Sequence, residues 1–269
     1  MPELPEVETI KNELLPWVVG QRVTQVTILD GRLVSGISVE EFRRRLIGQM
    51  IDDIGRRGKY IIFHLASGQS LIIHLRMTGA LLLNPNKADR YARAVLQLSN
   101  GVQLVFSDRR RLGVMWLVKD ASDIVCKLGP EPLSGDFTTH VLAQTLSKHR
   151  IPIKAALIDQ SLVAGIGNMY ADEALFAAKI HPLERADNLS SGQIKTLYRS
   201  IREVLRSAIS SKGASVDTYV RPEGELGTAQ FSFKVAHRGS KPCLVCGTPI
   251  QRILVRNRGS YFCPSCQPS

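Results

Sequence analysis

Residues 3–18 carry an apolar side chain at every third or fourth position, a spacing that predicts a helix with one buried face. The apolar positions of this face are Val7, Ile10, Leu14 and Val18. Gly20 follows the pattern directly, as is typical of a residue just beyond a helix end. The chain is therefore expected to begin with a buried amphipathic helix.

A different pattern follows, made of short runs rich in apolar and β-branched residues. The runs cover residues 22–28, 60–65, 71–75, 80–83, 94–98, 102–106 and 114–118. Turn-forming pairs such as Ser67-Gly68 and Thr78-Gly79 separate several of them. Only residues 38–46 interrupt with a helical pattern. Many short strands with few helices between them predict an antiparallel β-sandwich.

The pattern changes again at the Gly-Pro-Glu-Pro stretch of residues 129–132, which is typical of a stiff linker. Helical periodicity returns in residues 169–179 and 193–209, and the chain is loop-like from Gly213 onward. We therefore expect an α+β multidomain fold. Its three parts are residues 1–130 (helix and sandwich), residues 131–225 (helical domain) and residues 226–269 (a small cysteine-containing β-hairpin).

Charge narrows the class of partner. The chain has 35 Lys and Arg against 24 Asp and Glu, a net charge of +11. Residues 226–269 hold six basic residues and no acidic one. Such a bias favours a polyanion, and nucleic acid rather than membrane because no basic amphipathic helix stands out; a merely solvated basic surface is the alternative. No apolar run reaches the ~20 residues of a membrane span, and no secretory segment is visible, so we expect a cytoplasmic protein.

The cysteines of the basic tail predict a metal site. Cys243 and Cys246 form one CxxC pair, Cys263 and Cys266 form a second, and sixteen residues separate the pairs. This spacing suits a tetrahedral Cys₄ site for one structural zinc ion. A pair of disulfides is one alternative, which fits a reducing cytoplasm poorly. A redox CxxC motif is the other, which is not expected in duplicate without a β–α–β setting. Cys126 stands alone and is expected to be a small buried apolar side chain.

The first six residues offer a nucleophile. Met1 is normally removed when a residue as small as proline follows, which leaves Pro2 as a terminal secondary amine. An α-amine titrates near about pH 8, so part of it is neutral and nucleophilic at physiological pH. Glu3 and Glu6 lie close enough to supply an acid and a stabilising carboxylate. The alternative is an ordinary frayed chain end.

The opening Met-Pro-Glu-Leu-Pro-Glu-Val-Glu-Thr resembles the start of bacterial formamidopyrimidine-DNA glycosylases, also called 8-oxoguanine DNA glycosylases. The resemblance continues through residues 56–60, 73–79, 128–133 and 165–170 to the cysteine tail, and so covers essentially the whole chain. The start of the sister endonuclease VIII type resembles Met-Pro-Glu-Gly-Pro-Glu, with glycine in place of Leu4. Leu4 therefore favours the branch of the family that acts on purine lesions. As a colinear set, the motifs are far more specific than any one of them.

The resemblance implies four catalytic residues. Pro2 would form a Schiff base with the sugar, and Glu3 would protonate the sugar ring oxygen. Lys59 would donate a proton during β-elimination, and Arg258, between the cysteine pairs, would serve δ-elimination. Read without the resemblance, Lys59 and Arg258 are phosphate contacts.

The resemblance also implies DNA contacts in the helical domain. Asn168 and the glycines before it precede a predicted helix, where backbone N–H groups and an amide can hold a phosphate. This segment matches the helix–two-turn–helix element of the family, and Arg150 and Lys154 resemble further DNA contacts.

Extruding a base from the duplex costs a few kcal/mol and leaves a gap. The resemblance implies that Met77, Arg110 and Leu112 fill this gap. Leu112 departs from the usual phenylalanine, Arg109 departs from an Asp-Pro pattern, and Tyr91 stands where a DNA-contacting histidine is common. These departures leave the lesion range and the opposite-base preference open.

The expected protein is a monomeric, bifunctional enzyme of base excision repair that carries one structural zinc ion. It would bind double-stranded DNA containing oxidised bases or abasic sites in a cleft between its domains, excise oxidised purines and leave a one-nucleotide gap by β,δ-elimination. Residues 221–230 are expected to cover the extruded base, and the enzyme would act on the nucleoid. A catalytically silent zinc protein that binds DNA and a glycosylase for oxidised pyrimidines are the alternatives.

Overall fold

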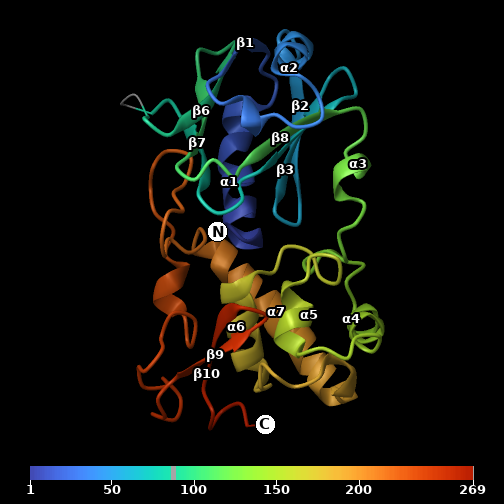
Figure 1. The fold of residues 1–269 in the computed structure, drawn as a ribbon, viewed down its shortest axis with the longest axis vertical. Helices are drawn as coiled ribbons and strands as arrows, with labels where there is room; N and C mark the ends of the chain where they lie inside the picture. Colours follow the sequence, from blue (N-terminus) through green and yellow to red (C-terminus); the bar gives the residue numbers. More distant parts are fainter. Residues whose placement is uncertain (86–88, 269) are drawn as a thin grey trace. The chain divides into compact units, whose positions relative to one another are not determined.

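The computed structural model describes residues 1–85 and 89–268 (Figure 1). The chain divides into two compact units. The first comprises Met1–Cys126 together with Ser211–Thr228, and the second comprises Lys127–Ser210 together with the chain from Ala229 onward. No helix in the described part of the chain is long and apolar enough to cross a membrane.

The first unit begins with helix α1 (Leu4–Val18), as the apolar spacing predicted. All four residues of the predicted apolar face are fully buried. A second helix, α2 (Val39–Leu46), is capped by the Ser38 hydroxyl, which accepts a hydrogen bond from the backbone N–H of Glu41. It buries Phe42 and Leu46 in the same core as α1.

The strands of this unit form two four-stranded antiparallel sheets, with orders β1-β6-β7-β5 and β2-β3-β4-β8. The strands are β1 (Val23–Ile28), β2 (Ile51–Arg57), β3 (Tyr60–Leu65), β4 (Ser70–His74), β5 (Gly79–Leu83), β6 (Ala92–Leu98), β7 (Gln103–Asp108) and β8 (Val114–Val118). One apolar core takes side chains from both sheets and from α1. The predicted sandwich is confirmed, and each predicted run is a strand.

Strand β2 escaped prediction for a local reason. Its buried residues Ile51 and Ile54 are three positions apart, and the pairing register with β3 shifts between Ile51 and Asp53. The irregularity breaks the period of two on which strand prediction depends. Cys126, directly after the short helix α3 (Ser122–Val125), is exposed, so its expected burial is wrong.

The second unit holds the helices α4 (Thr139–Leu146), α5 (Ile153–Ile158), α6 (Asn168–Ala178) and α7 (Ser191–Ser210). Helices α6 and α7 are the two predicted ones, and α6 contacts both α5 and α7. The shorter α4 and α5 span only two turns, too short for a clear apolar period. Strands β9 (Gln251–Val255) and β10 (Arg258–Phe262) pair as the expected antiparallel hairpin.

The segment Ser211–Thr228 packs with the sandwich although it follows the last long helix. The Leu83 N–H at the end of β5 donates to the Pro222 carbonyl at 2.8 Å. The guanidinium of Arg221 lies 2.7 Å from a carboxylate oxygen of Glu13 on α1. Such contacts join residues far apart in sequence, so no local sequence pattern predicts them. The three-part domain division from the sequence stays a prediction.

Candidate functional site

The N-terminal dipeptide is held by the start of α1. Glu3 is the N-cap residue and has an extended backbone (φ −103°, ψ −172°), and Glu3 and Glu6 form a capping box. Met1 is exposed, whereas Pro2 and Glu3 are buried. The helix N-terminus carries a partial positive charge, which favours carboxylates at this point. The predicted nucleophile and acid therefore lie side by side on an ordered helix end and not on a frayed terminus.

Glu6 is a positioning residue. One oxygen of its fully buried carboxylate accepts from the Glu3 N–H at 2.7 Å, and the other accepts from the Ala214 N–H at 2.8 Å. Gly213, just before Ala214, has φ +78°, and a Cβ there would lie 2.9 Å from Glu6 Cγ. Since both oxygens bind backbone groups, Glu6 fixes the segment that follows α7 against the N-terminus of α1. Its expected role as a stabilising carboxylate stays a prediction.

Lys59 lies in the tight turn between β2 and β3 and is buried. Arg56 supports this turn, because its side chain donates to the Gly58 carbonyl at 2.9 Å and to a Glu8 carboxylate oxygen at 2.6 Å. Burial would raise the pKa of Glu8, but hydrogen bonds from Lys11 and Arg56 outweigh it and lower that pKa. These contacts hold the turn that carries Lys59 against α1, the helix that begins directly after Pro2 and Glu3.

His74 is a residue of this region that sequence reasoning did not single out. It ends β4, is buried, and packs edge-on against Tyr60 at 4.5 Å between ring centroids. Burial lowers the pKa of His74 to about 3, and the positive charges of Arg76 and Lys59 act in the same direction. Its Nδ1 accepts from the Arg76 N–H at 3.0 Å, so the neutral ring carries its proton on Nε2. His74 can donate a hydrogen bond there but cannot supply positive charge near neutral pH.

The three predicted gap-filling residues come together in the first unit. Met77 and Leu112 are 43% and 41% exposed, so both apolar residues are open to a binding partner. Arg110 Nη1 lies 3.0 Å from Met77 Sδ, so the two loops that carry these residues touch. The third predicted contact of this unit, Tyr91, has its ring covered by the Arg90 guanidinium at 4.6 Å. Its role in DNA contact stays a prediction.

In the second unit, helix α6 begins at Asn168 and contacts the hairpin of β9 and β10 at that point. Asn168 Nδ2 donates to the Gly259 carbonyl of β10 at 2.7 Å. Lys154 Nζ donates to the Asn168 carbonyl at 2.6 Å and to the carboxylate of Asp172 one turn further along α6. These contacts fix the start of α6 against β10.

Lys154 lies deep in this unit. Its side chain is 0% exposed and its ammonium is engaged by Asn168 and Asp172, so it orders Asn168, the residue predicted to hold a phosphate. The predicted DNA contact of Lys154 itself stays a prediction. Arg150, by contrast, has a side chain that is 86% exposed and lies 3.7 Å from Asp187, so its guanidinium is open to a phosphate.

Two neighbouring carboxylates of α6 anchor the C-terminal part of this unit. Burial raises the pKa of Asp172 to about 7, against the opposing attraction of Lys154 and a hydrogen bond from the Tyr261 N–H. Burial likewise raises the pKa of Glu173, whose carboxylate accepts from the backbone N–H groups of Lys234, Val235 and Ala236 at 2.8–3.0 Å. Neither carboxylate was singled out from the sequence, because neither belongs to a recognisable motif.

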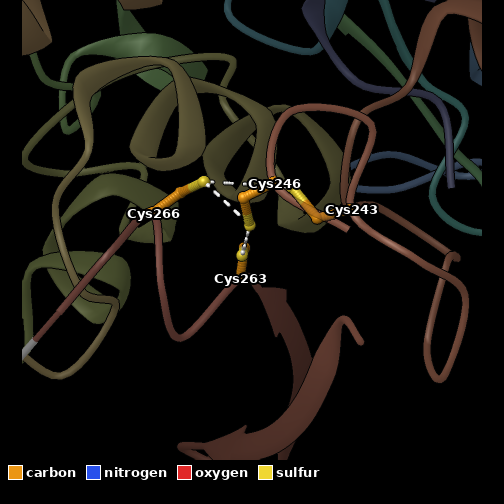
Figure 2. Close-up of side chains that lie close together, drawn as sticks. All are labelled: Cys243, Cys246, Cys263 and Cys266. Atoms are coloured by element: carbon orange, nitrogen blue, oxygen red, sulfur yellow. Dashed lines mark hydrogen bonds between the residues drawn. The ribbon is translucent and has the colours of Figure 1, made fainter. Parts of the chain in front are cut away.

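The four predicted cysteines converge at the base of the hairpin (Figure 2). Their sulfur atoms all lie within 4.8 Å of one another, with separations of 3.4, 3.5 and 3.9 Å for three of the pairs. Four thiolates at about 2.3 Å from one ion would stand roughly 3.8 Å apart, whereas a disulfide needs about 2.05 Å. The donors fit one tetrahedral structural zinc ion, which leaves no position for a substrate.

Arg258 is presented by this zinc hairpin. It opens β10 and pairs with Val255 across a two-residue turn, Arg256-Asn257, whose φ angles of +47° and +60° suit a tight hairpin. The Arg258 side chain is exposed. The zinc-stabilised hairpin thus holds a cation at its tip, and the predicted part of Arg258 in δ-elimination stays a prediction.

Family models of known proteins match this chain in three segments. The model of the formamidopyrimidine-DNA glycosylase N-terminal domain matches residues 1–115, that of the H2TH domain of the same glycosylase matches residues 128–220, and that of the zinc finger found in FPG and IleRS matches residues 240–268. The formamidopyrimidine-DNA glycosylase of Symbiobacterium thermophilum is 43% identical over 274 residues, covering 100% of this chain and 90% of the relative. That of Bacillus subtilis is 39% identical and covers 99% of both chains.

Solved structures agree with these sequence relatives. A mutant of Lactococcus lactis FPG in complex with a Fapy-dG-containing DNA matches with a TM-score of 0.93 and 36% identity, over 100% of both chains. The MutM (FPG) protein of Thermus thermophilus matches with a TM-score of 0.91 and 39% identity, over 99% of this chain and 98% of that one.

Proposed function

This chain belongs to the formamidopyrimidine-DNA glycosylase family, and from that premise we propose that it excises oxidised purines from double-stranded DNA and then cuts the strand at the resulting abasic site. The observation that carries this proposal is the Pro2–Glu3 pair. It is buried at the ordered start of α1, in a chain that resembles the family along its full length.

The chemistry begins with removal of Met1, which frees the Pro2 nitrogen. This amine attacks C1′ of the damaged nucleotide, and the bond between C1′ and the base breaks with the electron pair leaving on the base, which takes up the proton released from the Pro2 nitrogen. Glu3 protonates the ring oxygen, the sugar opens, and Pro2 and C1′ form an iminium. The iminium then acts as an electron sink for the loss of the 3′ phosphate in β-elimination and the 5′ phosphate in δ-elimination.

Lys59 and Arg258 supply the cations for these later steps. The buried position of Lys59, on a turn fastened to α1 by Arg56 and Glu8, supports a role close to the reacting sugar. Neutral His74 beside it can donate a hydrogen bond without competing for the lysine's proton. Arg258 acts from the tip of the zinc hairpin, so the zinc ion serves catalysis only by holding that hairpin.

DNA binding rests on exposed cations and on base extrusion. Arg150 and the cations of the zinc module contact phosphates, while Met77, Arg110 and Leu112 enter the gap left by the extruded base. The partner is DNA with oxidised bases or abasic sites. Because the relatives named above are bacterial DNA glycosylases, the chain acts in the bacterial cytoplasm, on the nucleoid.

The test is a cleavage assay with the zinc-loaded full-length protein. Four end-labelled duplexes carry one 8-oxoguanine, one formamidopyrimidine, one oxidised pyrimidine or one abasic site, and denaturing gels resolve β- from β,δ-elimination products. We expect both purine lesions and the abasic site to be cut, mainly with β,δ-elimination ends. Glu3→Gln should lose base excision, whereas Glu40→Gln, on an exposed residue of α2, should not. Binding to all duplexes without cleavage of any would leave a silent DNA-binding protein, and cleavage of the pyrimidine lesion alone would leave an endonuclease VIII-like enzyme.

A further inference from the structure

Asp108, the last residue of β7, is a buried carboxylate to which the chemistry above gives no role. Its side chain is 1% exposed and faces the loop that follows it. One oxygen accepts from the backbone N–H groups of Leu112 at 2.7 Å and Gly113 at 2.8 Å. The other accepts from the Arg110 N–H at 3.1 Å and from the Thr78 hydroxyl. A single carboxylate therefore sets the positions of three backbone amides in the loop.

The loop needs this support because its backbone is not relaxed. Arg111 has φ +57°, a left-handed conformation that a non-glycine residue adopts only at a cost. A Cβ on Gly113 would lie 2.3 Å from Phe106 Cζ, so the chain there is pressed against the core. Without the Asp108 carboxylate, the N–H groups of Leu112 and Gly113 would lose their acceptor and that of Arg110 would keep only the Thr78 hydroxyl, so the loop would relax.

Thr78 joins a second loop to the same carboxylate. Its hydroxyl donates to Asp108 and accepts from the Arg110 N–H at 3.1 Å. Thr78 directly follows Met77, and the Asp108 loop carries Arg110 and Leu112. The Thr78–Asp108 pair thereby links the backbones under three side chains that reach outward from two separate loops.

We propose that Asp108, together with Thr78, is a positioning residue for base extrusion: it pre-orders the two loops so that Met77, Arg110 and Leu112 enter the duplex as one rigid wedge. This inference rests on the proposed function. A wedge that is ordered before binding does not lose backbone freedom at the moment of insertion. Asp108 is 1% exposed and its carboxylate is engaged by its own loop and by Thr78, so we expect its effect at the step that unstacks a base.

The experiment compares Asp108→Asn with wild type under single-turnover conditions on two matched duplexes, one with 8-oxoguanine and one with a pre-formed abasic site. Asparagine has the same shape but offers donors where backbone N–H groups need acceptors. We expect base excision to slow by about 10–100-fold, the loss typical of leaving buried donors unpaired. Abasic-site cleavage should change less than about threefold, because no base remains to be unstacked. Asp52→Asn, on an exposed residue of β2, is the matched control.

Thr78 supplies an independent arm if Asp108→Asn fails to fold. Thr78→Ser keeps the hydroxyl and should behave as wild type, whereas Thr78→Val removes it and should reproduce the selective loss in base excision. In parallel, 2-aminopurine placed beside the lesion reports unstacking by its fluorescence, which should rise on binding of wild type and less with Asp108→Asn or Thr78→Val.

Equal losses on both duplexes would overturn the proposal and leave Asp108 as a residue of general structural importance. Undiminished excision by both Asp108→Asn and Thr78→Val would overturn it as well. If the wild-type chain cuts neither duplex, the proposed function fails instead. The fluorescence arm then still decides the role of Asp108, because unstacking requires binding and no catalysis.

Discussion

Replacing Lys154 by methionine should lower the free energy of unfolding of the second unit. The size of the loss follows from the burial of Lys154 and its partner. Lys154 and Asp172 form an ion pair with side chains 0% and 1% exposed. Removing one partner of a buried ion pair typically costs about 3–5 kcal/mol, because the other charge is left buried alone. For a unit of this size, that corresponds to a drop of roughly 10–20 °C in Tm.

The pH dependence follows from the raised pKa of Asp172. Burial places this pKa at about 7, above the unfolded value of about 3.9. The stability that Asp172 contributes is therefore complete below about pH 4 and is lost as pH rises through 7. Lys154 holds the pKa down, so its removal raises the pKa further. Lys154→Met should consequently cost more stability at pH 8 than at pH 6.

Urea unfolding followed by circular dichroism, in zinc-containing buffer at both pH values, measures these differences. Lys148→Met, on an exposed lysine, is the matched control. The double variant Lys154→Met/Asp172→Leu should recover most of the loss, since neither charge is then buried. The reasoning is refuted if Lys154→Met stays within about 1 kcal/mol of wild type at pH 8, or if the double variant is no more stable than the single one.

Three further outcomes test other parts of the account. Removal of zinc by chelation and refolding should abolish DNA binding while the strand signal in circular dichroism persists, because the four thiolates hold only the terminal hairpin; undiminished affinity in metal-free protein would contradict this. Affinity should fall steeply with salt, with a slope of log K against log salt near about −5 for roughly six phosphate contacts, and a slope near zero would show that the positive charge faces elsewhere. Leu112→Phe should raise affinity for undamaged and lesion duplexes alike, because an aromatic wedge stacks on a base by about 1–3 kcal/mol. Abasic-site cleavage by that variant should stay nearly unchanged, and an equal change in both activities would show that Leu112 is no wedge.

The parts of the fold that depend on residues close together in the chain could be predicted from the sequence. The apolar spacing of α1, the short runs that became strands and the two CxxC pairs each depend on neighbours within a few residues, and each is present as predicted. Strand β2 was missed because an irregular register breaks its alternation. The Thr138 hydroxyl, which accepts from the Val141 N–H, was a readable start signal for α4.

The support beneath the site could not be derived in this way. Glu6 joins residues 208 positions apart when it accepts from Ala214, and Asp108 joins Thr78 to its own loop across 30 positions. A buried lysine such as Lys154 looks like any surface lysine until its partner Asp172 is placed beside it. Such polar groups reveal their role only through the contacts that offset the cost of their burial, and those contacts exist only in the folded chain.

The most direct test of the central claim is borohydride trapping on 8-oxoguanine DNA, followed by mass spectrometry of the cross-linked peptide. The account predicts that the mature chain lacks Met1 and that reduction joins the Pro2 nitrogen to C1′ of the sugar. Trapping should be lost when Met1 is retained on the chain. Active enzyme that retains Met1, or a cross-link at Lys59 in place of Pro2, would contradict it.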